Sequence, residues 1–273
     1  MSLVVVTVVK DDVAGLAFTC ASLDRQTLPV THLIVDGASG ASMRPLLDER
    51  AALEGTTVVS ERDHGIFDAM NRALALVQPD DRVWFLNAGD ALIHDDDFAY
   101  VDAATAGDDF TWGFGPARVI ERDGSVREVQ AQAPYTPHNH AYGLTPICHQ
   151  ATVVRAQLLL QLGGFDFAHY PLAADYRTLL QLARIAPPMQ WDRPVVDYRA
   201  GGLSDRWLLR AHWQQHRARC EQLDTSTVGT ARSLVRVTHM TARITTGRAI
   251  ERLARTGIVP ADWRRRRASA RRG

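Results

Sequence analysis

Short apolar runs alternate with helical patterns along the first part of the chain. Four of these runs are rich in β-branched or aromatic residues and predict strands, namely LVVVTVV from Leu3, HLIVD from His32, TTVVSE from Thr56 and RVWFLN from Arg82. The last run is bounded by the turn signal QPDD and by Gly89, as expected of a buried strand. Strands that alternate with helices build a largely parallel sheet, so the pattern predicts an α/β, Rossmann-like fold with helices flanking the sheet.

One helical pattern lies between the third and fourth predicted strands. Its apolar positions recur with the 3.6-residue period and predict one packed face, made of Ile66, Met70, Ala73, Leu74 and Val77. Asp68 and Asn71 lie off this face. Polar side chains on a helix that opens next to a binding crevice suit contacts to phosphate groups, and they equally suit solvation or capping.

The second half of the chain has a less regular pattern. FTWGFGPARVIERDGSVREV alternates around a DG turn and predicts a hairpin, whereas APYTPHNHAYGLTP predicts a loop. Further elements are then expected in order: a helix from Asp175 to about Arg184, a strand MQWDRPVVDYR, a GGLS turn and a helix from Arg206 to about Gln222. Trp207 and Trp213 recur at helical spacing in the last helix, and we expect them to pack in the core.

Polar residues follow the predicted strands at their carboxyl ends. Thr7 follows the core of the first strand, and four acidic residues follow the others, namely Asp36, Glu61, Asp63 and Asp90. Ligands of open α/β sheets bind outside the carboxyl ends of the strands. Asp90 is therefore well placed to hold a divalent cation against a diphosphate. The alternative is local: Asp36 and Ser39 also suit a helix cap, and Asp90 also suits a turn.

The composition is that of a globular enzyme of the cytoplasm. The chain has 273 residues, of which 46% are hydrophobic and 23% charged, and no apolar stretch approaches the ~18 residues that span a bilayer. The first residues, MSLVVVTVVKDD, carry no basic leader, so we expect a strand there rather than a signal sequence. Cys20, Cys148 and Cys220 are isolated, which argues against a disulfide framework and a structural zinc site.

The zero net charge hides a strongly basic end. Residues 230–273 hold twelve arginines against Glu251 and Asp262, a formal charge of +10, and the remainder of this neutral chain is acidic. Apolar residues recur there with helical period, namely Leu234, Val237, Met240 or Thr241, Ile244, Ile250 and Leu253. The pattern predicts a basic amphipathic helix that binds an anionic membrane surface, each basic residue contributing about 1 kcal/mol. The alternative is a helix packed on the acidic body, followed by a disordered end.

Seven motifs occur in the order seen in family 2 glycosyltransferases, which the chain resembles from about Leu3 to about Arg219: IVDGAS, ERDHGIFDAMNRAL, WFLNAGD, CHQATVVR, GGFD, LAADYRTLLQLAR and GGLS. The resemblance implies the GT-A fold. It also implies an inverting enzyme that transfers a sugar from a nucleotide-diphosphate donor to a glycan or lipid-linked acceptor of bacterial polysaccharide or glycolipid synthesis, with Mn²⁺ or Mg²⁺. The GT-A domain would span residues 1–229, with a nucleotide-binding half at 1–95 and an acceptor-side half at 96–229, before the basic tail at 230–273.

The resemblance also assigns roles on the nucleotide side. Asp36, with Thr7 beside it, would hydrogen-bond the base, and Asp90 would be the last acid of the metal-binding motif. The motif usually has further aspartates where this chain has Asn87 and Gly89, which leaves one strong metal ligand. Magnesium is commonly held by one or two carboxylates plus phosphates and waters, so one acid suffices chemically. Nucleotide contacts are also expected from Glu61, Asp63, Asp68, Asn71 and Asn87.

On the acceptor side, Asp175 resembles the catalytic base that takes the proton of the attacking hydroxyl. It also suits the first turn of a helix, where the dipole favours an acid. His149 and Gln150 lie where the family lines the sugar and acceptor region. For His149 three alternatives stay open: it lines this region, it binds the metal, or it is a histidine of the core. Arg206 and Arg210 are candidate diphosphate contacts, and the predicted loop APYTPHNHAYGLTP would be an acceptor-side lid.

Two departures from the family pattern lie near the nucleotide. Asp11 stands where the family usually has asparagine, and Gly40 where an aspartate is common. They leave the base and the sugar undefined. Two other functions compete with the transferase: a nucleotide-sugar-binding protein without catalysis, which the thin metal motif favours, and a basic-tailed nucleic-acid-binding protein. We expect no nucleic acid as partner, because the body is acidic and lacks interleaved aromatic and basic residues.

Overall fold

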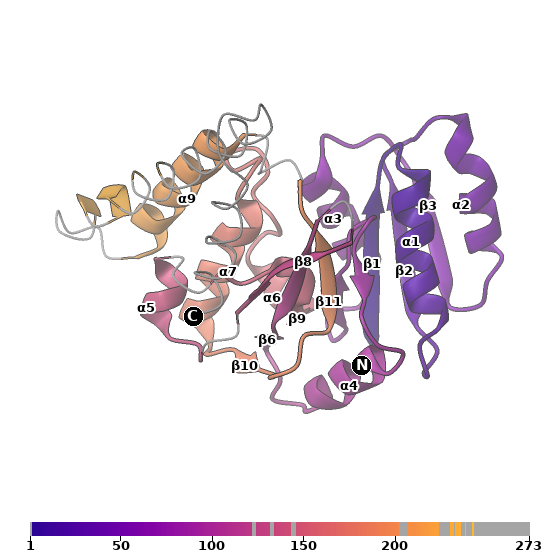
Figure 1. Ribbon diagram of the computed structural model, residues 1–273, viewed down its shortest axis with the longest axis horizontal. Coiled ribbons are helices and arrows are strands. Elements are labelled where there is room, and N and C mark those ends of the chain that lie inside the picture. The colour runs from indigo at the N-terminus through magenta and orange to yellow at the C-terminus, as the bar shows by residue number, and fades with distance from the viewer. Residues whose placement is uncertain are drawn as a thin grey trace, which may run out of the picture.

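The structure, a computed structural model, describes residues 2–121, 124–131, 134–142, 146–201, 207–223, 230–231, 233–235, 238 and 242. Within these residues the chain folds into a seven-stranded sheet, a four-stranded sheet and helices that pack around them (Figure 1). No helix in this described part is long and apolar enough to cross a membrane.

The larger sheet has the strand order β10-β6-β9-β4-β1-β2-β3. Its strands are β1 (Leu3–Val9), β2 (Thr31–Asp36), β3 (Thr56–Ser60), β4 (Arg82–Phe85), β6 (Trp112–Phe114), β9 (Thr152–Arg155) and β10 (Met189–Gln190). β1 pairs in parallel with β2 and β4, and β2 with β3, whereas β9 runs antiparallel to β4 and β6. All four predicted strands and the mainly parallel sheet are confirmed.

Helices pack around the two sheets. They are α1 (Val13–Asp24), α2 (Arg44–Ala51), α3 (Ile66–Leu74), α4 (Asp97–Thr105), α5 (Pro137–Ala141), α6 (Ala156–Gln161), α7 (Ala174–Ile185) and α9 (Leu208–Gln222), with single 3₁₀ turns η1 (Ala41–Met43) and η2 (His149–Ala151). α1 and α2 lie at the β3 end of the molecule, and α7 and α9 lie at the opposite end (Figure 1).

The packed face of α3 is rotated from the prediction. Met70 and Ala73 are buried as expected, but Ile66 is exposed and Phe67 takes its place in the core. The helix begins at Ile66, so this residue stands at the open first turn, while the Phe67 ring stacks on Phe165 at 5.7 Å. Asp68 and Asn71, off this face, are both half-buried.

Two predicted elements of the second half are wrong in extent. The predicted hairpin is limited to β7 (Ala117–Ile120) and β8 (Val126–Gln130), which pair antiparallel in the smaller sheet, while Trp112–Phe114 belongs to the larger one. The chain leaves the larger sheet at Gly115, where a Cβ would lie 1.7 Å from Nε1 of Trp191. The expected loop contains α5, because Pro137 starts a helix capped by the Thr136 hydroxyl, which accepts from Asn139 N.

The predicted strand MQWDRPVVDYR is two strands in different sheets. Its first part is β10, and its second is β11 (Val196–Arg199), which lies between β7 and β5 (Ala91–Leu92) in the smaller sheet. Between them Arg193 binds the carboxylates of Asp96 and Asp97 at 3.0 and 2.7 Å, and Pro194 has no N–H to continue a ladder.

The last predicted helix is α9, which packs on α7. The prediction that its tryptophans are core residues is wrong, because Trp207 and Trp213 are 58% and 57% exposed. The buried side of α9 consists instead of small and polar residues, including Ala211, Gln214 and Ala218. Arg206, the GGLS turn and most of the predicted tail at 230–273 lie outside the described residues. The predicted division at residue 229 therefore stays a prediction.

Candidate nucleotide and metal site

The carboxyl ends of the parallel strands bring the first polar group of the site together. Asp36 ends β2, and its neighbours in the register are Val9 of β1 and Ser60 of β3. The Asp36 carboxylate is fully buried and accepts hydrogen bonds from Ser39 N (3.0 Å), Ser39 Oγ and Ser60 Oγ (2.6 Å). Buried carboxylates are stable only when such donors surround them, so the local sequence DGAS also positions this acid.

A cavity of about 550 Å³ opens beside Asp36. Its lining comes from the turn after β2 and from the start of α2: Asp36, Ala38, Ser39, Gly40, Ala41, Met43, Arg44, Pro45, Leu47, Asp48 and Ser60. Both polar acceptors and apolar surface are available there, as in sites that take a planar, hydrogen-bonding ligand. Asp36 therefore lies on the wall of a cavity that has room for such a ligand.

Asp11 and Gly40, the two departures from the family pattern, are in contact. Asp11 Oδ1 accepts from Gly40 N at 2.8 Å, and Asp11 N donates to Ser39 Oγ at 2.7 Å. A Cβ on Gly40 would lie 3.6 Å from Asp11 Oδ1, so an aspartate there would bring two carboxylates together. The two departures thus compensate each other and tie the turn after β1 to the turn after β2.

Thr7 is not among the residues that line the cavity. It is fully buried, and its Oγ1 lies 2.8 Å from Nε2 of His32. Burial, followed by the charge of Arg50, lowers the pKa of His32 to about 3, so the ring is neutral and shares one hydrogen with the Thr7 hydroxyl. This contact gives Thr7 a role within the sheet.

The acidic residues after β3 are bonded within their own loop and to α3. Glu61 pairs with Arg72 at 2.7 Å, and Asp63 Oδ1 accepts from Gly65 N at 3.0 Å. A Cβ on Gly37 would lie 2.4 Å from Asp63 Oδ2, so the loop also touches the turn after β2. These contacts hold the loop to α3 and to the turn after β2, and both carboxylates already have partners within the protein.

The two predicted contacts on α3 have separate surroundings. Asp68 accepts from His64 N at 2.9 Å and faces Arg72. The Asn71 amide is satisfied by one backbone unit: Nδ2 donates to Phe165 O at 2.8 Å, and Oδ1 accepts from Phe165 N at 2.7 Å. Asn71 thereby holds the GGFD turn, where a Cβ on Gly164 would meet its Oδ1 at 2.4 Å.

Asp90 is buried at the carboxyl end of the fourth predicted strand. Its Oδ1 accepts from Arg199 N at 3.0 Å, and the Gln150 side chain also donates to it. Cys148 Sγ donates to Gln150 Oε1 at 3.0 Å, which directs the amide nitrogen toward Asp90. Burial raises the pKa of Asp90 to about 7, and the Arg199 N–H, the nearby His149 ring and the Gln150 amide oppose the rise. Gln150, itself buried, therefore contacts the acid rather than open space.

His149 connects the metal motif to the predicted base. Its Nδ1 lies 3.0 Å from Oδ2 of Asp175, in the first turn of α7, and its Nε2 lies 3.2 Å from Nδ2 of Asn87. Because the Asn87 amide donates to Nε2, the neutral ring carries its hydrogen on Nδ1 and donates it to Asp175. The predicted residues Asn87, His149 and Asp175 are thus in one chain of contacts, beside Asp90.

The donor set fits a weakly held divalent cation. Among the described residues no group of three or more His, Cys, Asp or Glu side chains could hold a metal. Asp90 nevertheless supplies a carboxylate, and the buried Asn87 Oδ1 has no hydrogen-bond partner in the described part of the chain. Oxygen ligands of this kind suit Mg²⁺ or Mn²⁺ when substrate phosphates and waters complete the coordination.

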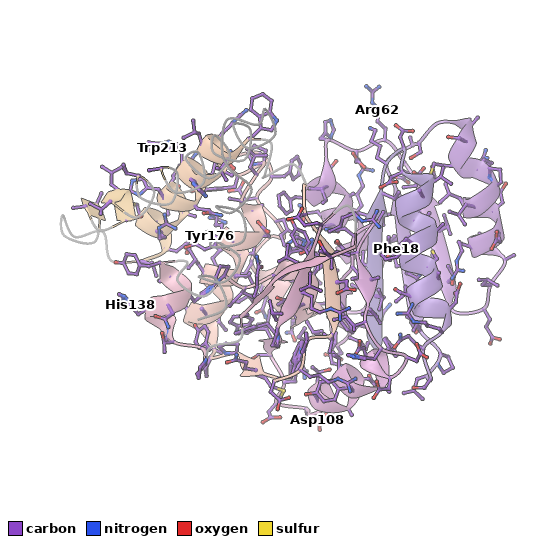
Figure 2. All side chains as sticks on the ribbon, viewed as in Figure 1. Phe18, Arg62, Asp108, His138, Tyr176 and Trp213 are labelled. Atoms are coloured by element: carbon purple, nitrogen blue, oxygen red, sulfur yellow. The ribbon has the colours of Figure 1, made fainter. Side chains whose placement is uncertain are left out.

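Sequence reasoning missed two residues that shape this site. Arg199 ends β11, binds Asp90 through its backbone, and places its guanidinium 4.9 Å from the centre of the Phe18 ring on α1, which Figure 2 labels. Thr19 of α1 donates to Asp90 O at 2.7 Å and accepts from Gly89 N at 3.0 Å. The basic end of VVDYR, one residue before GGLS, is a signal for Arg199, whereas no local signal marks Thr19.

The backbone of the turn before Asp90 depends on glycine. Gly89 has φ of +98°, with nothing within 4 Å of the place where a Cβ would stand. The position has room for a side chain but holds the backbone in a conformation that other residues rarely adopt. Arg210, the remaining described candidate for a diphosphate contact, lies on the exposed side of α9.

Comparison with known proteins identifies relatives of one kind. No family model matches the chain. Two Mycobacterium tuberculosis proteins, each named an uncharacterized glycosyltransferase, are 29% identical over 195 residues, which cover 68% of this chain and 70% of theirs.

Solved structures share the fold at low identity. Staphylococcus aureus TarS 1-349 with UDP-GlcNAc has a TM-score of 0.64 at 14% identity, covering 86% of this chain and 70% of that one. The mannosyltransferase PcManGT from Pyrobaculum calidifontis with GDP-Man and Mn²⁺ gives 0.56 at 17%, covering 94% and 82%. Glucosyl-3-phosphoglycerate synthase from M. tuberculosis with Mn²⁺, UDP and phosphoglyceric acid gives 0.52 at 18%, covering 82% and 80%. These findings confirm the GT-A fold and the resemblance to family 2 glycosyltransferases.

Proposed function

We propose that this GT-A chain is a glycosyltransferase that moves a sugar from a nucleoside-diphosphate donor to a hydroxyl group, with inversion at the anomeric carbon. The observation that carries the proposal is the chain of contacts Asp175–His149–Asn87 beside the buried Asp90. It joins a candidate base to a candidate cation site at the strand ends where ligands of such sheets bind. A separate cavity at Asp36 offers room for the nucleoside.

Asp36 would recognise the base. Its buried carboxylate is an acceptor on the cavity wall, and uracil and guanine both present N–H donors on their pairing edges. The three donors that already hold Asp36 fix its orientation, so binding would cost little reorganisation. The solved relatives contain UDP, UDP-GlcNAc and GDP-Man, and we therefore propose a UDP- or GDP-linked sugar as donor.

Asp90 and the Asn87 carbonyl oxygen would hold the divalent cation, together with the donor's phosphates. When bound, the cation supplies positive charge that offsets the charge developing on the departing diphosphate. Arg199 stands next to Asp90 and, among the basic residues that the structure describes, is the one best placed to add a second positive charge. Neither Arg206 nor Arg210 gains support for this role, since the first lies outside the described residues and the second is on exposed α9.

Asp175 would act as the general base. Its Oδ2 accepts from His149 Nδ1, which fixes the carboxylate and leaves Oδ1 to take the proton of the attacking hydroxyl. Attack on the face of the sugar opposite to the diphosphate is a single displacement, and it inverts the anomeric carbon. His149 is then a positioning residue: it orients Asp175 through one nitrogen and is oriented by Asn87 through the other.

The acceptor is proposed as a glycan or lipid-linked hydroxyl at the cytoplasmic face of the membrane. The basic composition of residues 230–273 supports association with an anionic surface, although most of this segment lies outside the described residues. The competing function is nucleotide-sugar binding without transfer. Its specific support is Gly89, which leaves Asp90 as the one acid of the metal motif.

Donor binding and transfer are tested together. UDP-GlcNAc and GDP-Man, each with and without Mn²⁺, should be screened by thermal shift, because a ligand at 100 times its Kd stabilises the native state by about 2.7 kcal/mol. Release of the nucleoside diphosphate with an acceptor mixture should then fall about 10²- to 10⁴-fold in Asp175→Asn, with donor binding unchanged. Asp108→Asn is the matched control, since Asp108 is an exposed aspartate far from the site (Figure 2).

Each outcome decides between the two functions. Binding that requires Mn²⁺, with turnover that depends on Asp175, supports the transferase. Binding with turnover that is absent, or indifferent to Asp175→Asn, supports the binding protein. Failure of both donors to bind with metal would contradict the nucleotide site itself.

A further inference from the structure

Helix α9 and Trp207, its N-cap residue, expose large apolar side chains to solvent. Trp207 and Trp213 are 58% and 57% exposed, and Leu209 is 65% exposed. Figure 2 shows Trp213 at the outer edge of the molecule, pointing away from the body. Large apolar side chains of soluble proteins are seldom exposed together, and contiguous groups of them mark interaction surfaces. We call Trp207, Leu209, Arg210 and Trp213 the α9 face.

The other side of α9 fixes its orientation against the catalytic half. Gln214 Oε1 accepts from Leu172 N at 2.8 Å, and Arg219 donates to the Tyr176 hydroxyl at 3.1 Å. Tyr176 follows Asp175 in the first turn of α7, and Leu172 lies two residues before this helix begins. Rotation of α9 that buried its tryptophans would break these buried contacts. The exposure of the α9 face is therefore set by the packing that also supports the proposed base.

Positive charge accompanies the exposed rings. Arg210 is exposed between the two tryptophans in sequence, and the one acid of α9, Glu221, is already paired with Arg217 at 3.0 Å. The chain next to this helix is fixed by Ser233, which contacts His216 and Arg219 at 2.7 Å each. That following segment carries the twelve arginines of residues 230–273.

Apolar side chains continue onto this segment. Leu234 and Val235, directly after Ser233, are 45% and 69% exposed. Exposed tryptophans and aliphatic residues that alternate with arginines are the composition of helices that lie in the headgroup region of an anionic bilayer. A second copy of this chain fits less well, because a two-fold contact through this face would bring the same positively charged surface of both copies together.

We propose that the α9 face docks on an anionic phospholipid bilayer, with Trp207 and Trp213 inserted among the headgroups and Arg210 at the phosphates. This inference extends the proposed membrane association to a described helix and is independent of the transfer chemistry. It places the bilayer on the side of α9 opposite to α7. A lipid-linked hydroxyl would then approach Asp175 from the membrane side.

The test is sedimentation of the full chain with vesicles of phosphatidylcholine alone or with phosphatidylglycerol. Binding should require phosphatidylglycerol, and Trp207→Ser/Trp213→Ser should weaken it by on the order of tenfold or more. Trp207→Phe/Trp213→Phe should largely retain it. Leu76→Ser is the matched control, because Leu76 is a 50% exposed apolar residue after α3. Replacing arginines 264–267 with glutamine in the full chain measures the contribution of the tail separately.

Fluorescence gives a second readout that depends on depth. In a Trp263→Phe background, vesicles with brominated acyl chains should quench the emission, and Trp207→Phe/Trp213→Phe should abolish the quenching. Unchanged sedimentation of the serine variant would overturn the proposal. So would protection of both tryptophans from acrylamide without vesicles, or a dimer that Trp213→Ser dissociates. Donor binding, measured on the same proteins, should be unchanged and reports separately on the proposed function.

Discussion

The burial of Asp90 predicts a pH-dependent affinity for the metal-bound donor. Its pKa is raised from 3.8 to about 7, so forming the carboxylate in the free protein costs about 4 kcal/mol as an order of magnitude. A divalent cation binds only the ionised form. The affinity for a nucleotide sugar with Mn²⁺ should therefore rise about tenfold between pH 6 and pH 8 and then level off.

The free protein should show the opposite trend. A carboxyl group whose folded pKa lies above its unfolded pKa stabilises the native state least when both states are ionised. This contribution of Asp90 to the free energy of unfolding should be full below about pH 4, decline as the pH rises to about 7, and stay constant above. The cation reverses the trend, because it favours the charged form that the fold disfavours.

Isothermal titration with a nucleotide sugar measures this linkage. A nucleotide sugar is the right probe, since it lacks the terminal phosphate of a nucleoside diphosphate, whose own pKa near 6 would add a slope. Asp90→Asn should abolish the part of the affinity that depends on Mn²⁺, and the pH dependence should be lost with it. An affinity that is equal at pH 6 and pH 8 in wild type, with Mn²⁺ saturating, would refute the reasoning about Asp90.

Three further predictions concern stability. His32, whose pKa burial lowers to about 3, should make the protein lose stability as the pH falls from about 6.5 toward 3, and His32→Asn should flatten that slope in urea unfolding. Gly40→Asp should destabilise the fold by about 1 kcal/mol through repulsion by Asp11, and adding Asp11→Asn should restore most of it, which a double-mutant cycle measures. Asn71→Ala should lower the free energy of unfolding by about 2 kcal/mol, because it removes both hydrogen bonds to the Phe165 backbone, and the Kd for the donor should stay unchanged. Weaker donor binding without destabilisation would instead favour a direct contact between Asn71 and the ligand.

The strands and the polar groups at their ends could be predicted because their signals are local. β-branched runs predict β1 to β4, and the parallel register brings Asp36 beside Ser60 without further information. Asp90 and Asp175 were recognised from motifs, and the structure brings His149 between Asp175 and Asn87. In each case the residue type and its neighbours in sequence carry the information.

The errors have a tertiary origin. Gly115 ends a strand of one sheet because Trp191, far along the chain, occupies the space next to it. Asn71 bonds to a backbone unit 94 residues away, and Thr7 to a histidine on the next strand, so neither partner is visible locally. Helical spacing predicts that Trp213 lies on one side of α9, but it does not tell which side of the helix faces the core.

The left-handed backbone at Gly89 limits how this protein can change. Restoring the aspartate that the family commonly has there would meet no steric obstacle, yet it would force a non-glycine residue into φ of +98° at a cost of about 1–3 kcal/mol. The Thr19 hydroxyl of α1 accepts a hydrogen bond from Gly89 N, so the backbone of this turn cannot relax alone. A single substitution that adds a second acid to the motif would thus destabilise the present turn. Evolution or engineering would have to reshape the turn before adding the ligand.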